Sequence, residues 1–202
     1  MFLKPTWNEG TGNSQELDAY NPVGGSIGTY KSGKKLNYEI GADFMSNTNE
    51  KIKIGLELAV GGLPGFQKQL PSRIAFPDDS IAKTTNGTYG SLSGKVQLNL
   101  TDNLQSYLTL GLVKTTSDQQ FLDTNMSGGD KINEKWFTLP TGTRYTIGTQ
   151  YKIKNNLFAD ISYGKMEYDQ HTMEYLANSG DIPRFTDSLE YEQIILGLRY
   201  KF

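Results

Sequence analysis

Nine charged side chains share one property that would let them do chemistry together. Each stands on the polar side of a segment in which apolar and polar residues alternate. If those segments enclose one interior, the charges face each other, and they either line an ion pathway or form ion pairs, because unpaired ions in a narrow interior cost several kcal/mol. We expect a network of ion pairs that fills the interior. Its predicted members are Glu39, Asp43, Lys53, Glu57, Lys95, Lys152, Asp160, Arg199 and Lys201.

A serine, histidine and acid arrangement for nucleophilic catalysis can also be drawn. His171 is the single histidine of the chain and lies two residues after Asp169, with Ser162 and Ser179 as candidate nucleophiles. Nothing in the spacing selects this arrangement, and a histidine exposed in a loop is the simpler interpretation. We therefore predict no catalytic residue and no enzyme.

Metal and cofactor chemistry has little support in the sequence. The chain has no cysteine, which excludes thiolate sites and disulfides. Asp78, Asp79 and the Ser-Gly-Gly-Asp stretch at 127–130 lack the alternating oxygen ligands of a calcium loop. We predict no metal site and no cofactor.

The bulk composition narrows the class of protein further. The chain has 202 residues, a mean hydropathy of −0.52 and a net charge of −2, with 20 basic residues scattered among 22 acidic ones. This balance argues against nucleic acid as a partner. No apolar run is long enough for a transmembrane helix, and 1–20 contains no secretory signal. We interpret the chain as a mature form with an added Met1.

The elements that must position the charges are strands. Seven segments alternate apolar and polar side chains with the period of two expected of a strand that has unlike faces. They lie at 36–44, 52–60, 92–100, 107–112, 145–153, 157–164 and 194–202. Three short polar turns, at 46–50, 101–103 and 154–156, join them in pairs. The connections at the other end are long, at 61–89, 115–142 and 168–188.

A closed barrel with both chain ends on the same side needs an even number of strands, so we expect an eighth strand before Leu36. Two candidates compete, 2–8 and 23–31. We prefer 2–8, because it leaves a long first loop at 9–33 and so keeps all long connections on one side. Short turns on one side and long loops on the other are typical of a membrane barrel. The sequence thus predicts a single domain over 1–202, an all-β antiparallel up-and-down transmembrane barrel of about 8 strands with short periplasmic turns and long extracellular loops.

The alternative is a soluble barrel or sandwich, such as a lipocalin, which also has one apolar face per strand. Two features favour the membrane. Glycines recur on the polar faces, as the crowded interior of a narrow barrel requires. Aromatic residues such as Phe44, Tyr151 and Phe202 stand near the ends of the apolar faces, where the bilayer interfaces would lie.

The closing stretch LGLRYKF resembles the terminal strand of Gram-negative outer-membrane barrels, which end on phenylalanine. The resemblance implies the bacterial outer membrane as location, lipid and lipopolysaccharide as surroundings, and Phe202 as the signal read by the barrel assembly machinery. From 51 onward the chain is similar to the eight-stranded outer-membrane protein W family, through IGLELAV, SYLTLGLV, NEKW and LFADISYGKMEYD. That family is associated with passage of small hydrophobic molecules.

Two functions therefore remain open. The first is a porin-like barrel that passes small, including hydrophobic, molecules across the outer membrane. Its apolar entrance would be formed by loop residues, namely Phe66, Phe76, Phe121, Trp136 and Phe137. The second is a structural or adhesive surface barrel with a plugged lumen, whose loops bind host molecules or lipopolysaccharide. Outer-membrane protein A-type and adhesin barrels share most of these features, so the sequence leaves both alternatives standing.

Overall fold

The computed structural model describes residues 1–17, 26–32, 34–49, 51–69, 81–122, 135–138, 141–174 and 184–201. Within these ranges, the side chains of 12–31, 66–83, 118–140 and 169–187 are not described. All regular structure in the described residues is β-strand. In that part of the chain, no helix is long and apolar enough to span a membrane.

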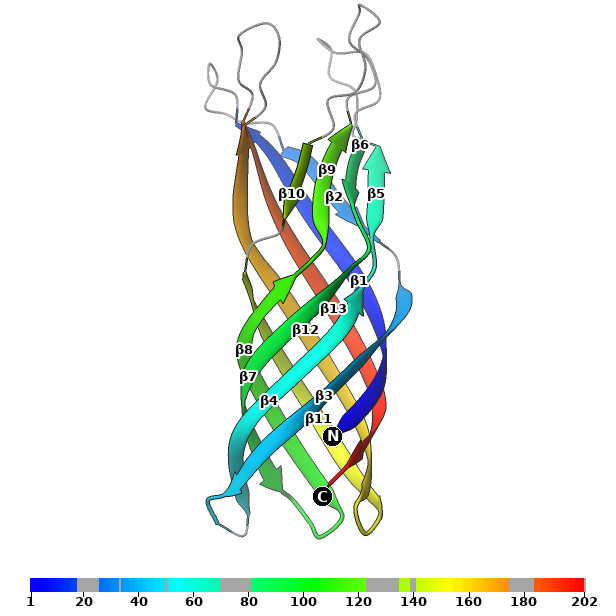
Figure 1. The fold of residues 1–202 in the computed structure, drawn as a ribbon, viewed down its shortest axis with the longest axis vertical. Coiled ribbons are helices and arrows are strands. Elements are labelled where there is room, and N and C mark those ends of the chain that lie inside the picture. Colours follow the sequence, from blue (N-terminus) through cyan, green and yellow to red (C-terminus); the bar gives the residue numbers. More distant parts are fainter. Residues whose placement is uncertain are drawn as a thin grey trace, which may run out of the picture.

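Eight long strands form a closed antiparallel barrel (Figure 1). Each strand pairs with the next one along the barrel, and β13 pairs with β1 to close it. The predicted fold is therefore confirmed. The strands are β1 (Phe2–Leu17), β3 (Lys35–Asn47), β4 (Ile52–Leu63), β7 (Gly87–Asn99), β8 (Leu104–Thr115), β11 (Gly142–Lys154), β12 (Leu157–Glu174) and β13 (Arg184–Tyr200).

Both candidates for the first strand form strands, but only the preferred one closes the barrel. β1 begins at Phe2 and pairs with β13 on one side, where Trp7 stands opposite Ile194, and with β3 on the other. The rejected candidate becomes β2 (Ser26–Lys31), which pairs only with the upper part of β1. β2 thus lies above β3 as a separate short strand.

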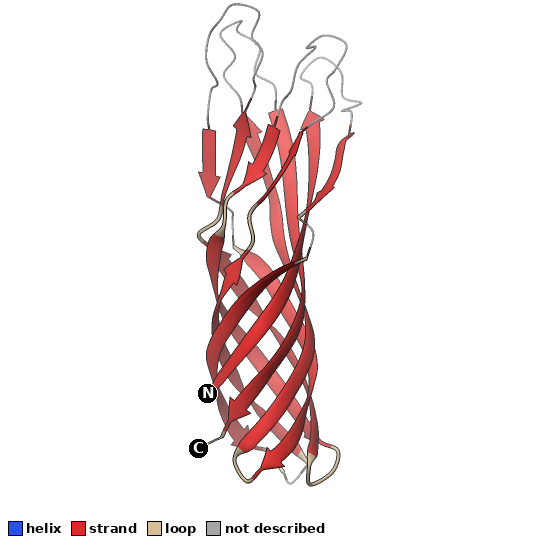
Figure 2. Ribbon diagram, turned by 90° about the vertical axis from the view of Figure 1, so that its right-hand side faces the viewer, coloured by secondary structure: helices blue, strands red, loops and turns tan. Residues whose placement is uncertain are grey.

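The long connections lie on one side of the barrel as predicted, and strand structure continues into every one of them. β5 (Phe66–Gln69), β6 (Ile81–Thr84), β9 (Asp118–Leu122) and β10 (Lys135–Thr138) form a second, four-stranded sheet. Figure 2 shows these short strands above the barrel, separated from it by loop residues. The physical reason is that the arms of an antiparallel hairpin satisfy each other's backbone groups wherever they run side by side.

The two faces of each barrel strand differ as the alternation predicts. The outer face exposes a band of large apolar side chains, which in a membrane meets lipid. On β13, Ile194, Leu196, Leu198 and Tyr200 point outward, while Ile195 and Arg199 are fully buried. Among the described side chains, the polar face of the barrel wall is therefore turned to the interior.

Interior glycines lie directly opposite interior aromatic rings. Phe2 pairs with Gly41, Tyr89 with Gly61, Tyr107 with Gly148 and Tyr168 with Gly142. A Cβ on Gly148 would lie 2.6 Å from Cζ of Tyr107, closer than real Cβ atoms come to other atoms. The glycines therefore leave room for a ring from the neighbouring strand, which explains their recurrence on the polar faces.

We predict that Gly148→Ala destabilises the barrel by about 1–3 kcal/mol, because the added methyl group overpacks the contact with Tyr107. The free energy of unfolding in urea, measured in lipid vesicles, checks this. Gly90→Ala is the matched control, since a Cβ there has no heavy atom within 4 Å. Equal stability of the two variants would contradict the proposed packing.

Candidate functional site

The middle of the barrel holds a network of ions with balanced charge. Three carboxylates meet three cations there, and all six side chains are almost completely buried except Asp43, which is 11% exposed. The members are Asp43, Glu57 and Asp160 with Lys4, Lys95 and Arg199. Because the two signs are equal in number, no net charge is left in this part of the interior.

Arg199 of β13 is the centre of this network. Its guanidinium pairs with Asp43, lies 3.4 Å from Oε2 of Glu57 and, through Nε, 3.4 Å from Oδ2 of Asp160. Its planar fork of donors suits several carboxylates at once. The ion pairs therefore join β3, β4, β12 and β13 across the interior.

Two lysines complete the network around the Tyr107 ring. Lys95 Nζ lies 3.1 Å from Asp43 Oδ1 and 3.2 Å from Glu57 Oε2. Lys4 Nζ lies 3.2 Å from Asp160 Oδ1, and the Tyr107 hydroxyl donates to the same oxygen at 2.9 Å. Lys95 Nζ also stands 4.1 Å from the Tyr107 ring centre, a cation–π contact. One aromatic side chain thus supports both cations.

A second, separate ion pair lies towards the extracellular side. Arg144 of β11 pairs with Glu39 of β3, and both are fully buried. The Tyr89 hydroxyl donates to the same carboxylate oxygen, and Arg144 donates to Ser91 Oγ at 2.8 Å. This pair also balances its charge.

An apolar layer follows on the extracellular side of the Arg144–Glu39 pair. Seven buried residues form one cluster there: Leu63, Tyr89, Val113, Met166, Tyr168, Leu189 and Tyr191. The rings of Tyr168 and Tyr191 meet edge to face, with centroids 6.3 Å apart. The interior is therefore filled at successive levels, first by ions and then by apolar side chains.

The remaining predicted members of the network lie at its periplasmic end. Lys201 donates to Gln105 Oε1 and stands 4.0 Å from the Phe158 ring centre. Lys53 and Lys152 are partly exposed and form no ion pair with another described residue. These three lysines surround the periplasmic end of the lumen without a carboxylate partner among the described residues.

Two buried cations were missed at the sequence level. Lys4 belongs to a short segment with Pro5 in which no polar face was assigned. Arg144 stands one residue before the segment assigned at 145–153, and extending the alternation by one position would have placed it with Thr146 and Gly148. The alternation of apolar and polar residues thus already contained the information that Arg144 faces the interior.

The predicted entrance residues belong to the upper sheet. Phe66 lies on β5, Phe121 on β9, and Trp136 and Phe137 on β10. Their side chains are outside the described set, and Phe76 lies outside the described residues altogether. An apolar entrance therefore stays a prediction.

Other predicted features also fall outside what the structure describes. Phe202, Asp78, Asp79 and the stretch 127–130 are not described, and for His171 only the backbone is, opposite Asp187 on β13. Among the described residues, no group of three or more histidines and acids is arranged to hold a metal ion.

The barrel wall has a seam between β3 and β4. The ladder between them runs from Asn47 and Lys53 up to Glu39 and Gly61, where it stops. Beyond that point β3 continues along β1 as far as Lys35, and β4 continues along β7 as far as Leu63. The two strands therefore part at the extracellular end of the barrel.

Side chains replace the missing ladder bonds across the seam. Asn8 Nδ2 donates to the Gly62 carbonyl at 3.1 Å, and Lys35 Nζ donates to the Gly65 carbonyl at 2.6 Å. Asn8 is itself held by Gln193 at 2.6 Å. The seam is thus closed by a few side-chain hydrogen bonds instead of by a continuous backbone ladder.

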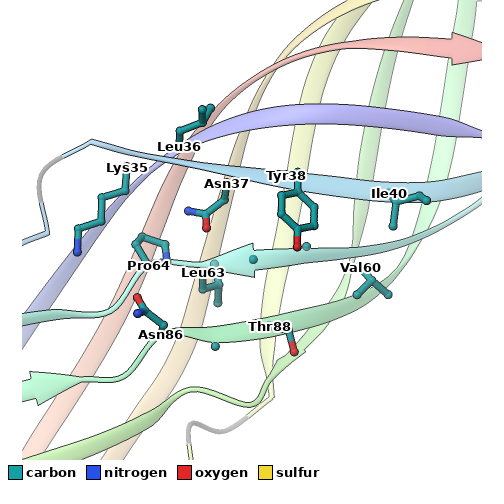
Figure 3. A pocket seen from close by; sticks show the side chains of 13 residues that line it. Lys35, Leu36, Asn37, Tyr38, Ile40, Val60, Leu63, Pro64, Asn86 and Thr88 are labelled. Carbon is teal, nitrogen blue, oxygen red and sulfur yellow. The ribbon is translucent and has the colours of Figure 1, made fainter.

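A pocket of about 670 Å³ lies in the seam (Figure 3). This volume is within the range of small-molecule sites. The pocket is lined by Lys35, Leu36, Asn37, Tyr38, Ile40, Val60, Gly61, Gly62, Leu63, Pro64, Asn86, Gly87 and Thr88. Leu36, Tyr38, Ile40 and Val60 belong to the outer apolar band, whereas Leu63 belongs to the interior apolar layer. The lining of the pocket therefore includes residues from both faces of the wall.

Sequence comparison with protein families agrees with this architecture. The family model described as the outer membrane protein β-barrel domain matches residues 10–202. The chain belongs to this family. Its location is accordingly the bacterial outer membrane, with the apolar outer band in lipid. No curated protein matches the chain in sequence.

Solved structures show the same fold at low sequence identity. The outer membrane protease OmpT from Escherichia coli superimposes with a TM-score of 0.61 at 7% identity, covering 100% of this chain and 95% of that one. The outer membrane protein OprG from Pseudomonas aeruginosa gives a TM-score of 0.50 at 12% identity, covering 100% and 96%. At such identities, the likeness of this outer membrane barrel to its neighbours concerns the fold alone.

We predict that Arg144→Met destabilises the barrel by about 3–5 kcal/mol, because it leaves the Glu39 carboxylate buried without its partner. The double variant Glu39→Gln with Arg144→Met should recover most of this loss, since no buried charge remains. Unfolding free energies in lipid vesicles measure both effects. A double variant as unstable as the single one would show that the loss of stability comes from removing the ion pair itself and not from leaving the Glu39 carboxylate unpaired.

Proposed function

We propose that this outer membrane barrel passes small apolar molecules sideways, from its extracellular end through the seam between β3 and β4 into the lipid. The single observation that carries the proposal is the pocket in the seam, whose lining includes Leu63 of the interior apolar layer and Leu36, Tyr38, Ile40 and Val60 of the outer apolar band. A molecule on this route would stay in contact with apolar side chains and would never need to enter the ionic network.

The packing of the interior favours this route over one along the barrel axis. An eight-stranded barrel is only wide enough for side chains to fill, and here Lys4, Lys95, Arg144 and Arg199 are all at most 2% exposed. An axial pathway would have to separate these cations from their carboxylates in a poorly hydrated interior. Breaking such buried pairs costs several kcal/mol each.

The seam, by contrast, opens at small cost. Widening the wall elsewhere breaks a run of backbone hydrogen bonds, whereas widening it here breaks the bonds from Asn8 to Gly62 and from Lys35 to Gly65. The neutral bond from Asn8 contributes about 1 kcal/mol, and the bond from the charged Lys35 contributes about 1.5–3 kcal/mol. Pro64 has no backbone N–H to give to a ladder, which also favours the open edge.

A second function is favoured by a different observation. β1, β12 and β13 have 16, 18 and 17 residues, well beyond the roughly 9–11 that a tilted strand needs to span a bilayer. A plugged barrel that raises strands above the membrane suits a structural or adhesive surface protein that binds host molecules or lipopolysaccharide. In either role we propose that the barrel is not an enzyme.

The axial and lateral routes differ in electrical conductance. We expect the purified barrel in planar lipid bilayers to show no persistent single-channel openings, because the ion pairs and the apolar layer fill the lumen. Large and lasting openings would contradict the plugged interior and favour a porin-like pathway along the axis.

The lateral route can be closed with a disulfide. The Cβ of Asn37 lies 3.5 Å from the position that a Cβ would take on Gly62, within the range of about 3.5–4.5 Å that a disulfide spans. We predict that whole cells carrying the oxidised double variant, Asn37→Cys with Gly62→Cys, take up a neutral apolar dye several-fold more slowly than cells carrying the native barrel.

The chain offers clean controls for this experiment because it has no cysteine of its own. Reducing agent should restore the uptake rate of the double variant, and each single cysteine variant should behave like the native barrel under both conditions. An oxidised double variant that takes up the dye at the native rate would sink the lateral route and leave the surface role as the better account.

A further inference from the structure

The seam pocket is polar at one end and apolar along the rest of its length. Lys35 is the first residue of β3, at the extracellular end of the seam, and is the one charged residue among the thirteen described residues that line the pocket. Leu36, Tyr38 and Ile40 follow on the same strand towards the membrane and are exposed on its outer face. Figure 3 shows Lys35 and Ile40 at opposite ends of the pocket.

The Lys35 ammonium has unused capacity to bind an anion. It has three donors, of which the structure assigns one, the bond to the Gly65 carbonyl at 2.6 Å. Lys35 forms no salt bridge within the part of the chain that the structure describes, and the other polar lining groups of the pocket are neutral. Among the described residues, no carboxylate pairs with this positive charge at the polar end of the pocket.

From these features we propose that the pocket selects a free amphiphile with one hydrocarbon chain and one carboxylate, and that Lys35 is the specificity-determining residue. This inference rests on the proposed lateral route and names its substrate class. The carboxylate binds Lys35 at the membrane boundary, and the hydrocarbon chain lies along Leu36, Tyr38 and Val60 towards the lipid. This orientation is the one that an amphiphile adopts at an interface.

The test compares dodecanoate with its uncharged methyl ester. Binding of each compound to the purified barrel is measured by calorimetry in neutral, lipid-free detergent micelles. We expect the native barrel to bind dodecanoate about two-fold to five-fold more tightly than the ester, as one exposed ion pair would give. Lys35→Gln should remove this preference and leave binding of the ester within about two-fold of native.

Lys34→Gln is the matched control, because Lys34 is exposed, adjacent and absent from the pocket lining. It changes the net charge equally and should keep the preference for dodecanoate. A loss of preference in both variants would reduce the effect to general surface charge and overturn the proposal. Unchanged heat-modifiable migration on detergent gels would show that both variants are folded.

Two outcomes separate this inference from the proposed function. If the native barrel binds the ester and passes the neutral dye but shows no preference for dodecanoate, the lateral route stands and the role of Lys35 fails. If it binds neither compound and passes no dye, the lateral route itself fails. Displacement of dodecanoate by purified lipopolysaccharide at equal concentration would assign the pocket to a membrane lipid and overturn the claim of a free substrate.

Discussion

The narrow interior of an eight-stranded barrel is the constraint on which the rest of this structure depends. Every inward position must be filled, and every charge placed there must meet its opposite because little water can reach it. Arg199 satisfies this requirement by holding carboxylates from three strands, and glycines make room for the rings beside it. The lumen is consequently filled by side chains in the part that the structure describes, which supports the proposed route through the wall.

The lower part of the barrel was predictable because its determinants are local. The period of two identified the outward face of the main strands. A strand end was misplaced at Arg144, and no polar face was assigned to the strand that carries Lys4. The seam was not predictable in this way. It depends on where the pairing of β3 with β4 stops, which is set by the competing pairings of β3 with β1 and of β4 with β7. Pro64 and Gly65 lie where β4 ends at the seam, but the sequence places them within the long connection 61–89 and so gives them no special role.

At the level of the seam, some barrel strands are interrupted and others are continuous. β4, β7 and β8 are each interrupted by two residues before strand structure resumes, at Pro64–Gly65, Thr85–Asn86 and Thr116–Ser117. β1, β12 and β13 continue past that level without such a break. The side of the barrel formed by β1, β12 and β13 is therefore a continuous sheet, whereas β4, β7 and β8 are interrupted. The seam lies at the edge of the interrupted side. Specific contacts, such as the hydrogen bond that Gly65 N–H donates to Asn86 Oδ1 at 2.6 Å, hold the interrupted segments together.

Lys4, on the strand that closes the barrel, contributes a positive charge to the interior ion pairs. Without β1, the two groups of ion pairs in the middle of the barrel would hold four carboxylates, Glu39, Asp43, Glu57 and Asp160, against three cations, Lys95, Arg144 and Arg199. The first strand brings the missing positive charge together with the ring of Phe2, on which Arg199 stacks at 4.4 Å. These two groups are therefore neutral only when β1 lies in place between β13 and β3, so the strand that closes the barrel also completes their charge balance.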